Sequence, residues 1–541
     1  MKIAAWLKEG GQALIDACAP RRRTLRQLRA KWGMPGDKDA DGASRLFDLT
    51  REAASVPVVD DQTWIDLEFP RLFADIDTSQ SPFGSQVLYR QLRFYAASPA
   101  DAATHYASCK TLQRDAPFRE RLQLALTNLD LDANWHLARF IFGSSPQIER
   151  IHRLLPWWSL CCLAVIIAML ASILPIWVWL TMIALNLWLI VRCSAPLFRD
   201  IEMLKACSRM VRSAHRLAAI RDGATSIPQL ARLRNQALLR RRIQRSLGWI
   251  GVLYSPLVQS IAVWLNLLFL VELAAYARTV TRFEQVREEL AATFESVGAL
   301  DAAIAVASWL ERQPLHCQPS ICSTPRLHLI DGIHPLVARP VPNSIRLETR
   351  SALITGSNMA GKTTFIKLVG INVILGRTLG MCLARHAVLP NTSVMAVIRG
   401  DHSVASGRSH YFAEMKAIQT FIAQADQGRC QLFLIDELFN GTNTVERLAA
   451  GRAVLERLGT RAQVLVTTHD VELQDDVSGP YDRYYFQEDP EVDGWFDYRL
   501  HAGRATRHNA IQLLARNGFP PDLVAEALRY ADAYAAEGAR T

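Results

Sequence analysis

One short segment constrains this chain more than any other, because it joins a phosphate-binding loop to the strand and the helix that such a loop requires. Residues 356–364 read Gly-Ser-Asn-Met-Ala-Gly-Lys-Thr-Thr and fit the pattern Gly-x-x-x-x-Gly-Lys-[Ser/Thr]. The apolar run Ser351–Thr355 before the loop is typical of a buried strand, and the residues from Lys362 onward are typical of a helix. This order predicts an α/β fold of the P-loop NTPase type that binds ATP.

The fixed positions of the loop each have a chemical role. Glycines let successive backbone N–H groups turn toward a triphosphate, Lys362 reaches the β- and γ-phosphate oxygens, and the Thr363 hydroxyl ligates Mg²⁺. The positive end of the following helix lies beneath the phosphates. The predicted nucleotide-binding residues are Gly356, Ser357, Asn358, Met359, Ala360, Gly361, Lys362, Thr363 and Thr364.

Two further strand ends supply the remaining chemistry. The apolar run that begins at Leu432 ends in Asp436 and Glu437, and strand ends of this kind bring acidic groups to the carboxyl edge of a parallel sheet. We expect Asp436 to hold Mg²⁺ and Glu437 to orient or deprotonate the attacking water. His469 follows the next apolar run, Gln463–Thr468, and could sense the γ-phosphate. Together these residues predict metal-assisted ATP hydrolysis by in-line attack of water.

The ATP-binding half resembles one family. The loop is similar to the Gly-Pro-Asn-Met-Gly-Gly-Lys-Ser-Thr loop of MutS proteins, including its unusual Asn-Met pair. Residues 406–415 resemble the MutS signature segment, in which a serine, here Ser409, reaches across a dimer to the partner's nucleotide. Residues 435–444 resemble the family's Walker B strand and the loop after it, and Thr468-His469 its switch histidine.

The resemblance extends upstream of the loop. Gly332-Ile-His-Pro335 is similar to the Gly-Arg-His-Pro segment before the MutS ATPase domain, and residues 77–84 resemble the start of the MutS helical core. The sequence predicts a polar, basic leader (1–62). The resemblance implies that a MutS core-like all-α domain (63–319), an ABC-type ATPase domain (320–500) and a helical dimerisation segment (501–541) follow it. It also implies a homodimer that shares its ATP sites across the interface, with DNA as a candidate partner.

The leader departs from the family. About sixty residues precede the core-like segment, which are too few for both the mismatch-reading and the connector domains of the family. Each independent domain usually needs at least ~50 residues and often more than 100. We therefore expect no mismatch reading by the family's usual domains. Phe486-Gln-Glu488 has the spacing of the mismatch-reading Phe-x-Glu motif, but it lies within the ATPase region, where coincidence explains it better.

A second departure is a long apolar insertion. Residues 154–191 contain no charged side chain, a length that suits two membrane crossings, because each takes roughly 17–25 residues. Pro175 near the middle predicts the tip of a helical hairpin. Tryptophans suit the membrane interfaces, and arginines at both outer ends predict cytoplasmic flanks. A buried helical hairpin is the alternative. The sequence thus predicts anchorage in the cytoplasmic (inner) membrane, with the ATPase domain in the cytoplasm.

A second apolar segment, 246–276, contains an uncharged stretch over residues 246–271 and leaves the topology open. It could form one kinked span, a short re-entrant pair or a buried core helix. Because ATP is cytoplasmic, a cytoplasmic N-terminus requires an even number of crossings before Gly356. We therefore expect two crossings or four.

Composition is compatible with a membrane protein. The chain has 541 residues, 50% of them hydrophobic, a mean hydropathy of +0.05 and a net charge of +9. The densest basic run, 21–31, could be a nucleic-acid arm, a membrane-surface helix or a solvated face. Lys8 and Glu9 interrupt the apolar stretch that a signal peptide would require.

The sequence predicts a membrane-anchored, MutS-like ATPase whose nucleotide state drives a conformational switch that acts on DNA. The alternative is an ABC-type membrane ATPase that couples hydrolysis to transport or to remodelling of a membrane complex without DNA. The absence of a Leu-Ser-Gly-Gly-Gln motif disfavours a transporter, as does the small, apolar membrane portion.

Overall fold

The computed structural model divides into two compact units. It describes residues 20–38, 40–127, 129, 135–143, 150–221, 227–236, 264–271, 274, 283–357, 359–398, 410–428, 432–439, 443–470, 472–488, 496–504 and 518–538. A helical unit comprises residues 1–55, 73–93 and 104–312, and an α/β unit comprises residues 56–72, 94–103 and 313–541. The chain passes between the units five times: after Ser55, within α5 (Phe69–Ile76), after Arg93, within α7 (Pro99–Arg114) and after Arg312.

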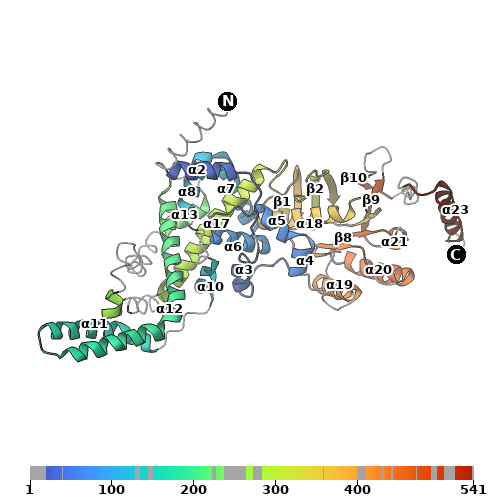
Figure 1. The fold of residues 1–541 in the computed structure, drawn as a ribbon. Helices are drawn as coiled ribbons and strands as arrows, with labels where there is room; N and C mark the ends of the chain where they lie inside the picture. The colour runs from blue at the N-terminus through green and yellow to red at the C-terminus, as the bar shows by residue number, and fades with distance from the viewer. Residues whose placement is uncertain are drawn as a thin grey trace. The chain divides into compact units, whose positions relative to one another are not determined.

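The helical unit is built around α17, which packs along α6 (Figure 1). Its described elements are α2 (Pro20–Lys31), α3 (Arg45–Thr50), α6 (Pro82–Arg93), α8 (Ala116–Leu126), α10 (Leu137–Phe142), α11 (Arg150–Leu170), α12 (Ile176–Ala219), α13 (Pro228–Asn235), the 3₁₀ helix η1 (Glu284–Val286) and α17 (Arg287–Glu311).

Small residues allow α6 and α17 to lie close together. A Cβ atom on Gly298 of α17 would lie 2.5 Å from the Val87 side chain, and one on Gly84 of α6 would lie 2.5 Å from the Asp301 carboxylate. The fully buried Asp301 accepts hydrogen bonds from the backbone N–H groups of Gln80 (3.0 Å) and Ser81 (2.8 Å) just before α6. Burial nevertheless raises the pKa of Asp301 to about 6.

Among the described residues, α17 together with η1 is the helix whose length and composition would allow a membrane crossing. The apolar window of Glu284–Glu311 is 78% buried inside the protein, however, as expected for the central helix of a packed core. The apolar stretches of α11 and α12 are shorter, Trp157–Leu170 and Ile176–Arg192.

Helices α11 and α12 form an antiparallel hairpin that projects from the other helices of this unit (Figure 1). Pro175 precedes α12, where its missing N–H group costs no helical hydrogen bond. Inside the hairpin, the Trp158 indole N–H donates to the Asn186 side-chain oxygen at 2.8 Å, and the Asn186 amide donates to the Leu267 carbonyl oxygen at 2.9 Å. A described part of the second apolar segment thus contacts the hairpin.

The α/β unit contains two sheets. The larger has six strands in the order β10-β9-β4-β8-β7-β6, and the smaller has the order β1-β5-β2-β3. The strands are β1 (Ser320–Cys322), β2 (Leu327–Gly332), β3 (Asn343–Leu347), β4 (Ser351–Thr355), β5 (His386–Pro390), β6 (Val394–Val397), β7 (Leu432–Asp436), β8 (Gln463–Thr468), β9 (Tyr481–Glu488) and β10 (Phe496–Ala502). The helices are α4 (Asp61–Asp66), α18 (Lys362–Thr378), α19 (His410–Asp426), α20 (Thr444–Gly459), α21 (Glu472–Asp476) and α23 (Pro521–Gly538).

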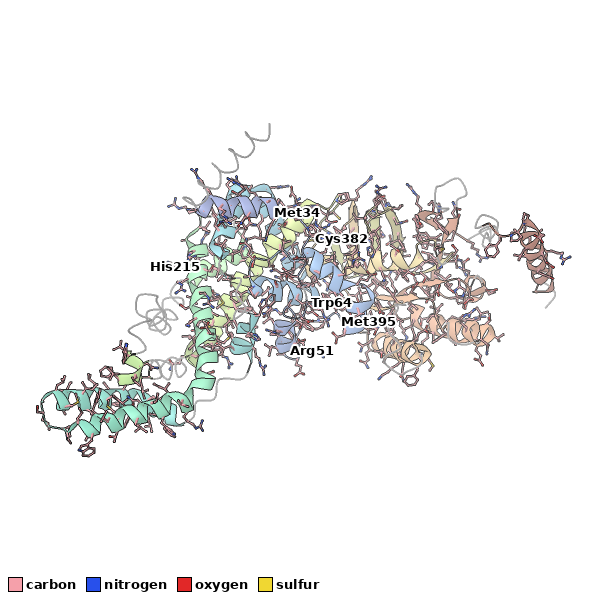
Figure 2. The ribbon with its side chains drawn as sticks, in the orientation of Figure 1. Met34, Arg51, Trp64, His215, Cys382 and Met395 are labelled. Carbon is pink, nitrogen blue, oxygen red and sulfur yellow. The ribbon has the colours of Figure 1, made fainter. Side chains whose placement is uncertain are left out.

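The edge strand β6 is covered by residues of the same unit that precede it in the sequence by more than 290 positions. Backbone N–H groups of Val394 and Ala396 donate to the hydroxyls of Tyr95 and Thr63, each at 2.9 Å, and the N–H of Ile398 donates to Asp66 at 2.9 Å. Trp64 of α4 accordingly lies beside β6 in Figure 2. Side chains thus satisfy alternate donors of an edge that could otherwise pair with another chain.

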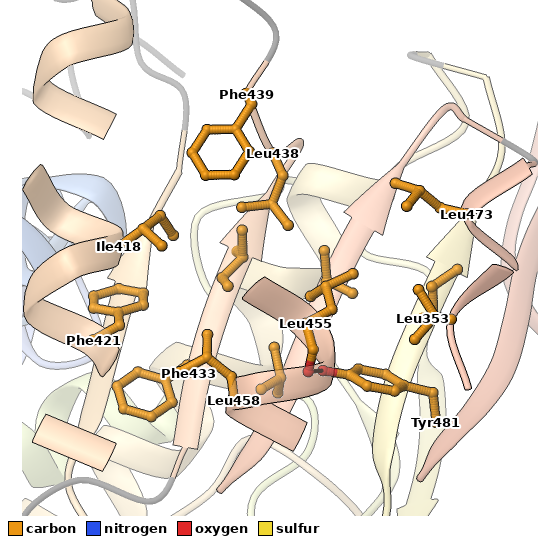
Figure 3. Close-up of a cluster of buried hydrophobic side chains, with 14 of the residues drawn as sticks. Leu353, Ile418, Phe421, Phe433, Leu438, Phe439, Leu455, Leu458, Leu473 and Tyr481 are labelled. Carbon is orange, nitrogen blue, oxygen red and sulfur yellow. Dashed lines mark hydrogen bonds between the residues drawn. The ribbon is translucent and has the colours of Figure 1, made fainter. Parts of the chain in front are cut away.

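The central strands of the large sheet are parallel, and all residues of β4, β7 and β8 are buried. On one face they pack with α19 and α20, where the rings of Phe421 and Phe433 stack at 4.8 Å (Figure 3). The parallel arrangement brings the carboxyl ends of β4, β7 and β8 to one edge, where the candidate site lies.

Candidate functional site

The phosphate loop connects β4 to α18. Gly356 and Gly361 have φ angles of +144° and +102°, and a Cβ atom on Gly356 would lie 2.8 Å from the Phe486 carbonyl oxygen. The loop therefore needs glycine at this position for both its conformation and its space. Lys362 begins α18, so the N–H groups of the first helical turn point back toward the loop.

Lys362 is buried and folds over the loop. Its ammonium group donates to the carbonyl oxygens of Gly356 at 2.6 Å and Ser357 at 2.9 Å. Burial lowers the pKa of Lys362, while Glu437 and Asp436 oppose that effect. The hydroxyl oxygen of Ser357 is buried without a hydrogen-bond partner among the described residues. A cation and an unsatisfied hydroxyl on one glycine-rich loop suit a phosphate group.

Asp436 at the end of β7 is held by two hydroxyl groups. The Thr363 hydroxyl donates to one carboxylate oxygen at 2.8 Å, and the Thr467 hydroxyl donates to the other. Because Thr363 gives its proton to Asp436, its lone pairs remain available to a metal ion. These oxygen groups are the ligands that Mg²⁺ prefers. The structure thus brings together the two predicted metal-site residues.

Glu437 and His469 approach each other beside this pair. The Glu437 carboxylate oxygen lies 3.6 Å from Nδ1 of His469, and Glu437 has a φ angle of +59°. A left-handed conformation is unfavourable for a residue with a side chain, and such strain concentrates at functional sites. The backbone N–H of Glu437 donates to the Thr467 carbonyl oxygen at 3.0 Å. This bond attaches the residue after β7 to the neighbouring strand β8.

An ion pair that the sequence did not predict supports the histidine loop. Arg447 of α20 donates two hydrogen bonds to the Asp470 carboxylate, at 2.9 and 2.7 Å, and both side chains are largely buried. The Asp470 N–H also donates to the Thr468 hydroxyl at 3.0 Å. This bidentate pair holds the residue next to His469 in place. The sequence gives no signal for it, because the two residues are 23 positions apart on different elements.

A cavity of about 280 Å³ adjoins the phosphate loop. Met359, Gly361 and Thr364 line it from the loop side, and Tyr498 lines it from β10. A Cβ atom on Gly361 would lie 3.4 Å from the Tyr498 ring. The cavity thus offers an aromatic ring next to the phosphate loop.

Asn343 holds the cavity wall together. Its side-chain amide donates to the Tyr498 carbonyl oxygen at 2.9 Å, and its side-chain oxygen accepts from the Leu500 N–H at 2.8 Å. The strand register shifts between Phe496 and Leu500, so Tyr498 lies in a local irregularity with a φ angle of +53°. No sequence pattern identifies such an irregularity, and the only signal was the aromatic residue itself.

The floor of the cavity has a buried histidine. Burial lowers the pKa of His334 to about 4, and the neighbouring Glu68 opposes that effect. Glu68 itself accepts a hydrogen bond from Lys367 of α18 at 2.7 Å, and that bond is the main cause of its lowered pKa. His334 is therefore neutral near pH 7, and the paired Lys367 and Glu68 fix the start of α18.

Several predicted residues lie outside the described part of the chain. They are Asn358 of the loop, Ser409 and the signature residues before it, and Gly441 and Thr442 after the Walker B strand. Asn443 is described, and its side chain caps α20 by accepting from the Glu446 N–H at 3.0 Å.

Comparison with known proteins agrees with this geometry. A family model described as MutS domain V matches residues 352–534. The chain is 31% identical over 262 residues to the DNA mismatch repair protein MutS of Natronomonas pharaonis, covering 45% of this chain and 30% of that protein. It is 32% identical over 271 residues to the protein of the same name from Streptococcus gordonii, covering 47% and 30%.

The protein of that name from Thermus aquaticus is 31% identical over 222 residues, which cover 40% of this chain and 27% of that protein. The matched part of the chain therefore spans less than a third of the length of these curated relatives.

Proposed function

The chain belongs to the MutS family, and from that premise we propose that it is a Mg²⁺-dependent ATP hydrolase that is anchored in a membrane and acts on DNA as a dimer. The observation that carries the proposal is the convergence of Lys362, Asp436 and Glu437 at one edge of a parallel sheet. Lys362 follows β4, and Asp436 and Glu437 lie at the end of β7, so side chains from two neighbouring parts of the sheet edge meet as in-line phosphoryl transfer to water requires.

Each residue has a distinct task in the proposed reaction. The loop N–H groups and Lys362 bind the β- and γ-phosphates, and Thr363 with Asp436 holds the metal ion. Bound Mg²⁺ would neutralise charge on the phosphate oxygens. Glu437 orients the attacking water and accepts its proton, and His469, 3.6 Å from Glu437, would respond to the γ-phosphate.

The cavity beside Tyr498 supports binding of the nucleoside. Its volume of about 280 Å³ adjoins the loop, so a nucleotide whose phosphates lie on the loop can place its base there. The Tyr498 ring would stack on the base, and stacking of this kind tolerates any base, so selectivity for adenine requires further polar contacts.

Exposed apolar surface supports the membrane anchor. Trp157, Leu170 and Trp177 of the hairpin are 70%, 76% and 63% exposed. Clusters of exposed large apolar side chains are uncommon on proteins that contact only water. They mark surfaces that contact lipid or another protein. We propose that α11 and α12 cross the bilayer as a hairpin and that the α/β unit faces the cytoplasm.

The dimer and its action on DNA follow from the family. Ser409 of one chain would complete the ATP site of its partner, so that nucleotide state controls the arrangement of the two subunits. The relatives are named as DNA mismatch repair proteins, and we propose a related action on DNA for this chain. A nucleic-acid ligand should stimulate ATP turnover by the detergent-solubilised dimer.

The decisive experiment substitutes Glu437→Gln. The amide keeps the size of the side chain but cannot accept a proton from water, so we expect ATP binding to persist while turnover falls by roughly two or more orders of magnitude. ATP binding is measured by titration and turnover by phosphate release from the same preparation. Asp426→Asn, a change in an exposed ion pair at the end of α19, is the matched control and should keep normal turnover. Unchanged turnover in Glu437→Gln would contradict the proposed role.

A further inference from the structure

The second half of α12 carries a row of basic side chains directly after the apolar hairpin. Residues 192–219 of this helix include six arginines or lysines and two acidic residues. Four of them, Lys205, Arg209, Arg212 and Arg216, lie three or four residues apart along one side of the helix, and we call them the basic stripe. Arg212 and Arg216 are exposed, and Lys205 and Arg209 are half-buried.

The opposite face of this half is packed into the helical unit. Helix α12 contacts α8, α13 and α17, and the Ser213 hydroxyl donates to the carbonyl oxygen of Ala125 in α8. The buried residues on this face are Met203, Leu204, Cys207, Met210, Ala214 and Leu217. The basic stripe is therefore held in a fixed direction by a packed helix.

The stripe has few acidic partners. Lys205 pairs with Glu202 at 2.7 Å, whereas Arg212 donates to the Ser208 hydroxyl at 3.2 Å and no acidic side chain of the described residues forms an ion pair with it. Arg209, Arg212 and Arg216 are three or four residues apart, and like charges at these spacings destabilise a helix slightly. Such a row is consistent with the binding of a polyanion from outside the protein.

The direction of the second half of α12 decides whether the basic stripe can reach lipid head groups. Along a straight helix, Arg209 and Arg216 would lie about 27 and 38 Å beyond Val191, at 1.5 Å per residue. That distance is several times the Debye length of about 8 Å, so lipid head groups could not attract them. Helix α12 is bent, however, and its second half runs across the direction of the hairpin (Figure 1).

The bend has a cause in the sequence and a consequence for the stripe. Pro196 falls between the apolar part of α12 and the basic stripe, and proline removes a helical hydrogen bond and kinks a helix. When the hairpin stands across the bilayer, the second half of α12 lies along its surface. Figure 2 shows His215, an exposed neighbour of Arg216, on the side of α12 turned away from α6 and α17, whereas Arg51 of α3 lies on another side of the unit.

From this arrangement we infer that the basic stripe binds the anionic phospholipid head groups of the membrane in which the hairpin is inserted. The inference rests on the proposed membrane anchor. Clusters of basic residues next to a membrane-spanning helix are attracted to an anionic membrane surface. The hairpin fixes the protein in the bilayer, and the stripe fixes the helical unit against its surface.

The test uses the full-length protein in two kinds of vesicle, one of phosphatidylcholine alone and one with about a quarter of phosphatidylglycerol. Arginines are modified with phenylglyoxal, and the rate at each position is measured by peptide mass spectrometry. We expect modification of Arg212 and Arg216 to slow several-fold in the anionic vesicles and to recover at high salt, because salt screens the attraction. The exposed Arg51 should react equally in both.

A triple variant tests whether the arginines of the basic stripe cause the preference for anionic lipid. Arg209→Gln/Arg212→Gln/Arg216→Gln should lose most of the preference for spin-labelled phosphatidylglycerol over spin-labelled phosphatidylcholine. A control with the same charge change, Arg51→Gln/Arg452→Gln/Arg457→Gln, alters exposed arginines on α3 and α20 and should keep that preference. Both variants should resist extraction at alkaline pH, because the hairpin is unchanged.

The outcomes separate this inference from the anchor on which it rests. Alkaline release of the unaltered protein from both vesicles would reject the anchor and the inference together. If the protein stays in the bilayer but Arg212 and Arg216 react equally fast in both kinds of vesicle, the inference alone is rejected. Stronger protection of these arginines by duplex DNA than by phosphatidylglycerol would assign the stripe to nucleic acid and would also reject it.

Discussion

Tyr498 shows how a residue in an unfavourable conformation can belong to a binding site. Its φ angle of +53° costs roughly 1–2 kcal/mol for a residue with a side chain, and Asn343 stabilises the irregular strand around it. This strain directs the aromatic ring to the cavity beside Gly361. We therefore attribute nucleoside binding to this residue.

Replacing Tyr498 tests that role. Tyr498→Ala removes the ring, and we expect the Kd for ATP to rise roughly three- to tenfold, since such aromatic contacts contribute about 0.5–1.5 kcal/mol. Tyr498→Phe keeps the ring and should bind ATP as the unaltered protein does. Direct titration measures both, and equal affinities for the alanine and phenylalanine variants would show that the ring does not contact the nucleotide.

The residues proposed to bind phosphate were predictable from sequence, and the residue proposed to bind the nucleoside was not. Lys362, Asp436 and His469 each follow a short apolar run, and such runs identify strand ends at the edge of a parallel sheet. Tyr498 comes from an antiparallel strand with an irregular register, which depends on tertiary contacts. Local sequence patterns therefore predict functional residues at the ends of regular strands. They do not predict a side chain whose position depends on an irregularity in a strand.

At the scale of elements, the edge of the large sheet depends on residues far away in the sequence. Thr63 of α4 accepts a hydrogen bond from the Ala396 N–H, and Asp66 accepts one from the Ile398 N–H. The sequence predicts helix in this region but cannot indicate which strand a helix will cover. Contiguous domains were expected, whereas residues 56–72 and 94–103 join the α/β unit through such contacts.

Removing one of these acceptors should destabilise the α/β unit. Thr63→Val leaves the buried Ala396 N–H without a partner, and we expect the free energy of unfolding to fall by about 1–3 kcal/mol. Thr420→Val alters an exposed hydroxyl that bonds within α19, and it should change stability by less than about 0.5 kcal/mol. Denaturant unfolding compares the two variants. Similar small effects from both would mean that the edge needs no such acceptor.

For the whole molecule, an ATP site and an apolar hairpin within one chain define the proposed function. The loop and its acidic partners lie in the α/β unit, and the hairpin belongs to the helical unit. Sequence predicted both features because each is a continuous pattern, a fixed motif or a long uncharged run. The direction of the basic stripe needed the fold, since it depends on the packing of α12 against α8, α13 and α17.

The central claim is that this molecule binds ATP through Lys362, and calorimetric titration of ATP with Mg²⁺ into the full-length protein in detergent tests it most directly. Lys362→Ala removes the buried ammonium group from the loop, whereas Lys31→Ala removes an exposed lysine on α2 as a control. The account predicts saturable binding to the unaltered protein and the control, and a loss of affinity of at least about tenfold in Lys362→Ala. Equal affinity in all three proteins, or no binding to any of them, would contradict it.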